Sequence, residues 1–299
     1  MERRQLEYFV AVAEERSFTR AAHRERVAQP AVSAQIQRLE RTVGQALLHR
    51  SAGQVRLTSA GEVLLPHARA ALAALRDGQS AVDEVTGLLR GVVSIGTVTA
   101  HPVDIARLMA EFNADHPAIE MTVVADTSDV LVDKLADGRL DAAIVSIGVD
   151  ESPPGLEYQV ITDEAIEAAV APRHVLARRK TLRLAELSDH RLISLPVGTG
   201  LRSRLDAACA AAGFRPHIAF EATSPVELVE MARYGLGVAI LPQSMARDRT
   251  DLHAMHLAPE LRGRLVWAWR RDLTSPAARR LCERARGMIT SGVVAAPVS

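Results

Sequence analysis

Residues 17–36 of the chain read SFTRAAHRERVAQPAVSAQI, and this stretch decides the fold of the N-terminal region. Ser17 is a residue type that caps helices, and the alanine pair that begins at Ala21 is small enough to pack inward. The helical pattern then breaks. Pro30 stands at the start of a further helix, where proline sacrifices no hydrogen bond. Two short helices with a tight turn between them predict a helix-turn-helix over about residues 18–37.

The flanking segments complete a small helical unit with a hairpin. Before the stretch, apolar side chains recur at helical spacing at Leu6, Phe9, Val10 and Ala13. Along the third helix, the expected buried stripe is Val32, Ile36 and Leu39, and the outward-facing side chains are Gln29, Ser33, Gln37 and Arg38. Residues 47–58, LLHRSAGQVRLT, indicate a short hairpin or wing.

Positive charge is concentrated in this same region. Residues 1–58 contain ten arginines and six acidic residues, whereas the whole 299-residue chain has 36 basic and 36 acidic residues. A basic head on a mildly acidic remainder suits a protein that binds phosphate groups at one end only.

The N-terminal pattern resembles the LysR-type transcriptional regulators. The resemblance is carried by LEYFVAVAE at 6–14, SFTRAA at 17–22, QPAVSAQI at 29–36 and VRLT at 55–58. It implies that the third helix enters the major groove of double-stranded promoter DNA. The implied DNA-binding residues are Thr19, Arg20, Gln29, Pro30, Ser33, Gln37, Arg38, Arg50 and Arg56. The sequence departs from the family pattern at Glu25, where an apolar residue is usual, and at Leu48, where an aromatic residue is common.

A long linker helix is predicted over residues 59–90. Ser59 and Glu62 have the spacing of a capping box, with Thr58 as an alternative cap. A 3-4 alternation of mostly apolar positions then runs through Leu65, Ala68, Leu72, Leu75, Gln79, Val82, Thr86 and Leu89. Such a helix would be ~48 Å long and could not bury both of its sides alone, so it either packs on its own domain or pairs with a second copy of the chain. We expect a dimer through this seam, and the family resemblance implies a homotetramer built as a dimer of dimers.

Residues 91–299 alternate strand and helix patterns, which predicts a largely parallel α/β sheet. The segments DGRLD at 137–141 and GLGVAILP at 235–242 also resemble the effector-binding domain of LysR-type regulators. The resemblance implies a two-lobed α/β fold like the type 2 periplasmic binding proteins. Lobe 1 would hold about residues 91–161 and 267–299, and lobe 2 about residues 162–266. The fold class is therefore α/β overall, with an all-α winged helix-turn-helix and a linker helix before the two lobes.

Hydroxyl side chains at predicted strand-to-helix junctions indicate where a small-molecule effector would bind. The family's ligand positions fall on Thr99, Ser128, Thr199 and Thr223. Hydroxyls and free N–H groups at helix N-termini favour an anionic ligand. Arg202 after the loop suggests a carboxylate in particular, although an ordinary surface arginine would explain it as well. Each hydroxyl is also a good helix cap, so a purely structural role stays open.

Other classes of function lack their motifs. The glycines at 198–200 have no following P-loop lysine, and those at 235–237 lack the third glycine of a dinucleotide fingerprint. His253 and His256 fall in a predicted loop without nearby acidic residues. We therefore expect neither an enzyme nor a cofactor or metal site. A transport-type solute-binding protein would need an export signal and no helix-turn-helix.

The two cysteines, Cys209 and Cys282, exclude a disulfide framework. A redox-sensing member of the family stays open through Cys209, although Gly200 stands where its partner cysteine would be expected. A small buried residue on an alanine-rich helix is the simpler interpretation.

No apolar run approaches the ~18–20 residues of a membrane span, and the N-terminus shows no signal-peptide pattern. We expect a cytoplasmic protein with no membrane partner.

Overall fold

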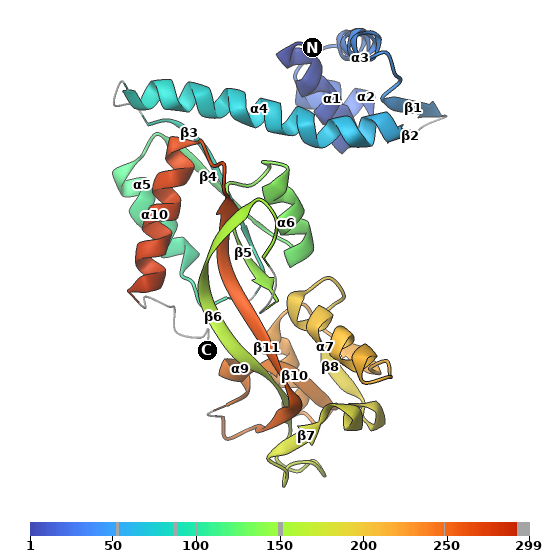
Figure 1. Cartoon of the computed structure of the whole chain (residues 1–299), viewed down its shortest axis with the longest axis vertical. Coiled ribbons are helices and arrows are strands. Elements are labelled where there is room, and N and C mark those ends of the chain that lie inside the picture. Colours follow the sequence, from blue (N-terminus) through green and yellow to red (C-terminus); the bar gives the residue numbers. More distant parts are fainter. Residues whose placement is uncertain (52–53, 86–88, 100, 149–151, 248, 292–299) are drawn as a thin grey trace. The chain divides into compact units, whose positions relative to one another are not determined.

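The computed structural model describes residues 1–51, 54–85, 89–99, 101–148, 152–247 and 249–291. They form two compact units (Figure 1). The first is Met1–Gly91 with the short segments Asp137–Arg139 and Thr274–Ala277, and the second contains most of the chain from Val92 onward.

The first unit begins with the helix-turn-helix that the sequence predicts. Its helices are α1 (Arg3–Glu15), α2 (Phe18–Arg24) and α3 (Gln29–Val43). The Ser17 hydroxyl caps α2 by accepting a 3.3 Å hydrogen bond from the Arg20 N–H. Pro30 lies in the first turn of α3, and Gly44 ends the helix with a φ of 77°. The predicted stripe of Val32, Ile36 and Leu39 is fully buried against α1 and α2.

The wing and the linker helix follow directly. Strands β1 (Leu48–Ser51) and β2 (Gln54–Leu57) pair antiparallel, and α4 runs over Ser59–Val85. Thr58 caps the helix, because its hydroxyl accepts a hydrogen bond from the Gly61 N–H at 3.1 Å. Of the two caps that the sequence offers, Ser59 and Thr58, the structure thus has Thr58. A side chain at Gly61 would collide with the Leu47 carbonyl oxygen, which explains the glycine.

The apolar seam of α4 divides into two parts. Ala68 and Leu72 are buried in the core of the first unit, which we call the head, in one hydrophobic cluster with residues of α1. Leu75 and Val82, further along, are 52% and 62% exposed. Thr86 lies outside the described residues. The prediction of one continuous intermolecular seam is therefore wrong for the first half of the helix, because that half belongs to the core of its own head.

The second unit is a mixed sheet covered by helices. Its elements in chain order are β3 (Gly91–Thr97), α5 (Ile105–Asp115), β4 (Ile119–Ala125), α6 (Ser128–Ala136), β5 (Ala142–Ile147), β6 (Leu156–Val170), β7 (Thr181–Arg183), the 3₁₀ helix η1 (Leu184–Asp189), β8 (Leu192–Ser194), α7 (Gly200–Ala211), β9 (Ile218–Glu221), α8 (Pro225–Arg233), β10 (Val238–Pro242), α9 (Gln243–Ala246), β11 (His253–Arg270) and α10 (Pro276–Thr290). The strand order is β4-β3-β5-β11-β6-β10-β8-β9, with β7 beside β11.

Two long strands join two lobes. Lobe 1 contains β4, β3 and β5, and lobe 2 contains β10, β8 and β9, while β6 and β11 run antiparallel through both (Figure 1). Pairs β3–β5, β8–β9 and β8–β10 are parallel, as the sequence predicts. The predicted lobe bounds include the return of the chain to lobe 1, but the length of β6 and β11 and their antiparallel pairing were not predicted, and β11 places His253 and His256 on a strand rather than in a loop.

Within the described ranges, no helix is long and apolar enough to cross a membrane. The same ranges contain no group of three or more histidine, cysteine or acidic side chains that could hold a metal ion.

Candidate DNA-binding and effector sites

Helix α3 presents a polar face to solvent. Gln29, Pro30, Gln37 and Arg38 are exposed, and Ser33 is half-buried between them. The N-cap, Ala28, has no side chain that could accept a hydrogen bond from the first turn. Polar groups along one face of a helix of this size are the feature that reads base edges in a major groove.

Helix α2 contributes two of the residues that the resemblance implies, Thr19 and Arg20, and both are exposed. Arg20 donates to the Glu15 carbonyl and forms an ion pair with the Glu15 carboxylate at 3.5 Å. Its neighbour Arg24 is held more tightly, at 2.7 Å from a Glu14 oxygen and 3.9 Å from Glu25. The departure at Glu25 is thus accommodated by an ion pair within the head.

Glu14 is the centre of that ion network. Burial raises its pKa, but hydrogen bonds from Arg24 and Arg69 outweigh burial and lower the pKa overall. The carboxylate therefore stays charged at neutral pH and keeps both arginines engaged.

In the wing, Arg56 is exposed on β2 opposite His49. The side chain of Arg50, on β1, lies outside the described residues. The wing is attached to the helices through the Val55 N–H, which donates to the Arg16 carbonyl at 3.4 Å. The implied DNA-binding residues thus come from α2, α3 and the wing of one compact head.

The predicted effector residues are only partly gathered. Ser128, at the start of α6, is buried, and its hydroxyl accepts from the Ser146 N–H at 3.0 Å. The loop at Gly198–Gly200 of lobe 2 lies against Ser146 of lobe 1. The approach is so close that a side chain at Gly200 would collide with Ser146. Thr199 is therefore brought close to this site, and its hydroxyl donates to the Pro196 carbonyl at 2.8 Å.

Thr99, Thr223 and Arg202 are placed differently. Thr99 and Thr223 are exposed, and Ser224 rather than Thr223 caps α8. Arg202 is mostly buried and forms ion pairs with Asp206 and Glu221, both at 3.0 Å. Its charge is thus met within lobe 2, so Arg202 gives little support for a carboxylate ligand.

Sequence reasoning missed two further polar groups, one on β8 and one beside the Gly198–Gly200 loop. Ser194, at the carboxyl end of β8, is fully buried, and its hydroxyl has no hydrogen-bond partner among the described residues. The side chain of Thr127 lies 3.5 Å from the position that a side chain at Gly198 would occupy. The signal that could have found Ser194 is a small polar residue at the end of an apolar strand, where α/β proteins bind ligands.

Two family models match the chain. The model described as "Bacterial regulatory helix-turn-helix protein, lysR family" matches residues 3–62, and "LysR substrate binding domain" matches residues 86–289. The chain is a LysR-type transcriptional regulator. Regulators of this family bind promoter DNA through the helix-turn-helix, carry an effector-binding domain and form oligomers.

Known relatives are similar in sequence to this chain over most of its length. The regulator is 34% identical to "HTH-type transcriptional regulator BudR" of Raoultella terrigena over 95% of this chain and 99% of the relative. It is 32% identical to a "Hydrogen peroxide-inducible genes activator" of Pectobacterium carotovorum subsp. carotovorum over 82% of each chain.

Among solved structures, a full-length OxyR variant from Pseudomonas aeruginosa superposes with a TM-score of 0.68 at 26% identity and 97% coverage of both chains. CbnR complexed with its target DNA gives a TM-score of 0.57 at 27% identity, covering 96% of this chain and 99% of that one.

The likeness to peroxide-responsive relatives makes the environment of Cys209 important. Its side chain is fully buried in α7, and burial, with a smaller effect of Asp206, raises the pKa of the thiol to about 11. The thiolate is the reactive form, and a thiol with so high a pKa is almost entirely protonated at neutral pH. This environment favours the structural interpretation of Cys209.

Hydrogen peroxide is therefore expected to leave the DNA affinity of the regulator unchanged. Cys209→Ser should bind DNA like the unaltered protein, both with and without peroxide. Peroxide titration followed by gel-shift assay and mass spectrometry of the intact chain checks this. A peroxide-dependent change that disappears in Cys209→Ser would restore the redox interpretation.

Proposed function

We propose that this regulator reads a promoter sequence with the polar face of α3 and changes its activity when a small anionic metabolite binds between the two lobes. The single observation that supports DNA reading best is the polar row of exposed Gln29 and Gln37 with half-buried Ser33 between them, on a helix whose opposite side is fully buried. We assign residues 1–58 to DNA binding, 59–90 to dimerisation and 91–299 to effector binding. The protein acts in the cytoplasm as a homotetramer and has no enzymatic activity of its own.

Replacing Gln29 or Ser33 with alanine tests the DNA-reading proposal. Each change should weaken binding to duplexes selected by the unaltered protein from a random library by ~1–3 kcal/mol per lost base contact. Binding to random duplex should change much less. Thr42→Ala, at the far end of the same helix, is the matched control, and fluorescence anisotropy measures all three. Equal losses on selected and random DNA would remove these residues from base reading.

The anionic effector is supported by the convergence of Ser128, Ser146 and the Gly198–Gly200 loop at the ends of strands. A thermal-shift screen of small carboxylates should find a compound that stabilises the full chain. Thr199→Val should abolish that shift and leave DNA binding of the free protein nearly intact. Thr181→Val, an exposed threonine on β7, is the control. A shift that survives Thr199→Val would place the effector elsewhere.

A further inference from the structure

The two crossover strands narrow to a ribbon between the lobes. On the lobe 1 side β11 pairs with β5 up to Arg264, and on the lobe 2 side β6 pairs with β10 from Ile166 onward. Residues 164–165 of β6 and 262–263 of β11 pair only with each other in the described sheet. A bend between the lobes must occur where the sheet has the fewest strands, which is at this ribbon.

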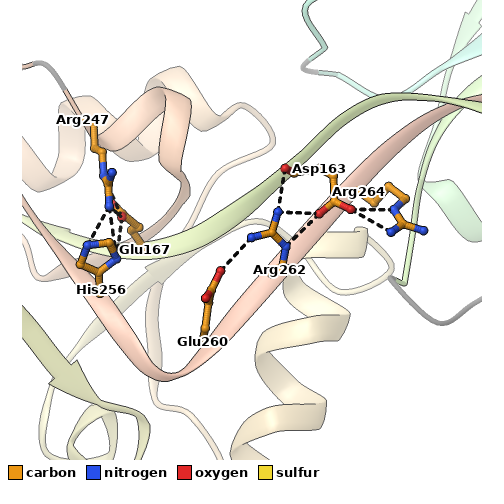
Figure 2. A network of polar contacts seen from close by, with 7 residues as sticks. All are labelled: Asp163, Glu167, Arg247, His256, Glu260, Arg262 and Arg264. Atoms are coloured by element: carbon orange, nitrogen blue, oxygen red, sulfur yellow. Dashed lines mark hydrogen bonds and ion pairs between the residues drawn. The ribbon is translucent and has the colours of Figure 1, made fainter.

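One carboxylate fastens the ribbon at that point (Figure 2). Arg264, directly opposite Asp163 in the sheet register, donates to Asp163 Oδ2 from Nε at 3.0 Å and from Nη2 at 2.8 Å. Arg262 donates from Nε to Asp163 Oδ1 at 2.9 Å and from Nη2 to the Asp163 carbonyl at 2.9 Å. Arg262 is itself held by Glu260 at 2.8 Å. We call Asp163, Arg262 and Arg264 the crossover clip.

The crossover clip differs from an ordinary surface ion pair. Asp163 and Arg264 have only 28% and 17% of their side chains exposed, so water and salt screen them less than a fully exposed pair. Several charge-assisted hydrogen bonds converge on one carboxylate and fix its geometry. The hydrogen bonds from Arg264, followed by those from Arg262, lower the pKa of Asp163, so the clip stays charged at neutral pH.

Beyond the clip, β6 is firmly attached to lobe 2. Glu164 accepts from the Ser244 N–H at 2.7 Å and from its hydroxyl at 3.0 Å, which joins β6 to α9. Glu167, almost completely buried, forms a 2.6 Å ion pair with Arg247 (Figure 2). The lobe 2 end of the strand is thus tied to its own lobe, and the clip spans the part of the ribbon that is left to bend.

We propose that the crossover clip sets the resting angle between the two lobes. While it is closed, the ribbon keeps one twist and the lobes keep one relative orientation. Without the clip, the ribbon bends through a wider range of angles. The lobes then take up many relative orientations, and their closure no longer follows one path. This inference does not depend on the effector proposal, and its test needs no ligand.

The test measures the distance between the lobes in the full chain. Spin labels are placed on cysteines introduced at the exposed positions Asp129 on α6 and Ala211 on α7. The native Cys209 and Cys282 are buried, with pKa values raised to about 11 and about 12, and therefore label poorly. Labelled chains are diluted with an excess of unlabelled protein, so that distances within one subunit dominate the pulsed electron resonance signal.

Asp163→Asn should broaden the inter-lobe distance distribution about twofold or more, whereas Asp163→Glu should restore most of the original width. The matched control is Asp251→Asn, which breaks the Arg249–Asp251 pair of 2.9 Å within lobe 2 and should leave the width unchanged. If Asp163→Asn does not fold, Arg264→Lys keeps the charge, loses the two-nitrogen contact and should broaden the distribution in the same way.

An unchanged width in the folded clip variants would overturn the proposal. An equal broadening in Asp251→Asn would overturn it too, since the effect would then follow from loss of any ion pair.

Discussion

Replacing both Leu75 and Val82 with glutamate is expected to dissociate the regulator's dimers and to weaken operator binding by about two orders of magnitude. The two side chains are seven residues apart on α4 and more than half exposed. Burying side chains of this size stabilises an interface by ~1.5–3 kcal/mol each, and each glutamate would put a charge there instead. A monomer would bind only one half-site of the operator.

Light scattering and anisotropy with operator DNA measure the two effects on the same samples. Ala81→Glu adds a charge to the same part of α4 outside the 3-4 alternation, and it should change neither mass nor affinity. Leu72→Glu is unsuitable as a test of assembly, because Leu72 is buried in the head and its replacement would unfold it. An unchanged mass for the double variant would locate the dimer contact outside α4.

The second large effect is expected at Gly200. A valine there would overlap both side-chain atoms of Ser146, and Ser146 cannot move far because its N–H is bonded to Ser128. Overpacking of this kind costs ~1–3 kcal/mol, and the strain can be relieved only by separating α7 from β5. Gly200→Val should therefore lower the midpoint of thermal unfolding and hold the two lobes apart.

Gly287→Ala is the matched control for that change. Gly287 lies in α10 with open space where a side chain would be added, and alanine is the better helix former. It should leave the stability unchanged or raise it slightly. If Gly200→Val melts like the unaltered protein and binds the same ligands, the Gly200–Ser146 approach is not a feature of the protein in solution.

The head could be predicted almost element by element because its signals are local. The caps at Ser17 and Thr58, the proline at the start of α3 and the glycine at its end each depend on a few adjacent residues. The periodicity of Val32, Ile36 and Leu39 was enough to tell the buried side of the recognition helix from the exposed side.

The antiparallel pairing of the crossover strands could not be predicted, for the opposite reason. Asp163 and Glu167 make β6 look polar and irregular, and their partners lie about eighty to one hundred residues further along the chain. Arg202 is different, because its partner Asp206 lies only four residues along the same helix and could have been found from the sequence, whereas Glu221 lies nineteen residues away. Long-range ion pairs leave no periodic pattern.

The division of α4 has a mechanical consequence. Ala68 and Leu72 belong to the same core as the buried residues of α3. The exposed half of α4 is therefore a rigid arm that moves together with α3, rather than a flexible linker. The stretch from Leu72 to Val85 is ~20 Å long at 1.5 Å per residue. A tilt of ~10° between two paired arms would therefore displace their far ends relative to each other by ~3–4 Å and turn one α3 helix relative to the other through the same angle. If two copies pair through this half of α4, as we propose, a modest rotation at their contact would be transmitted to both α3 helices, and the angle between the two arms would set which spacing of half-sites is bound.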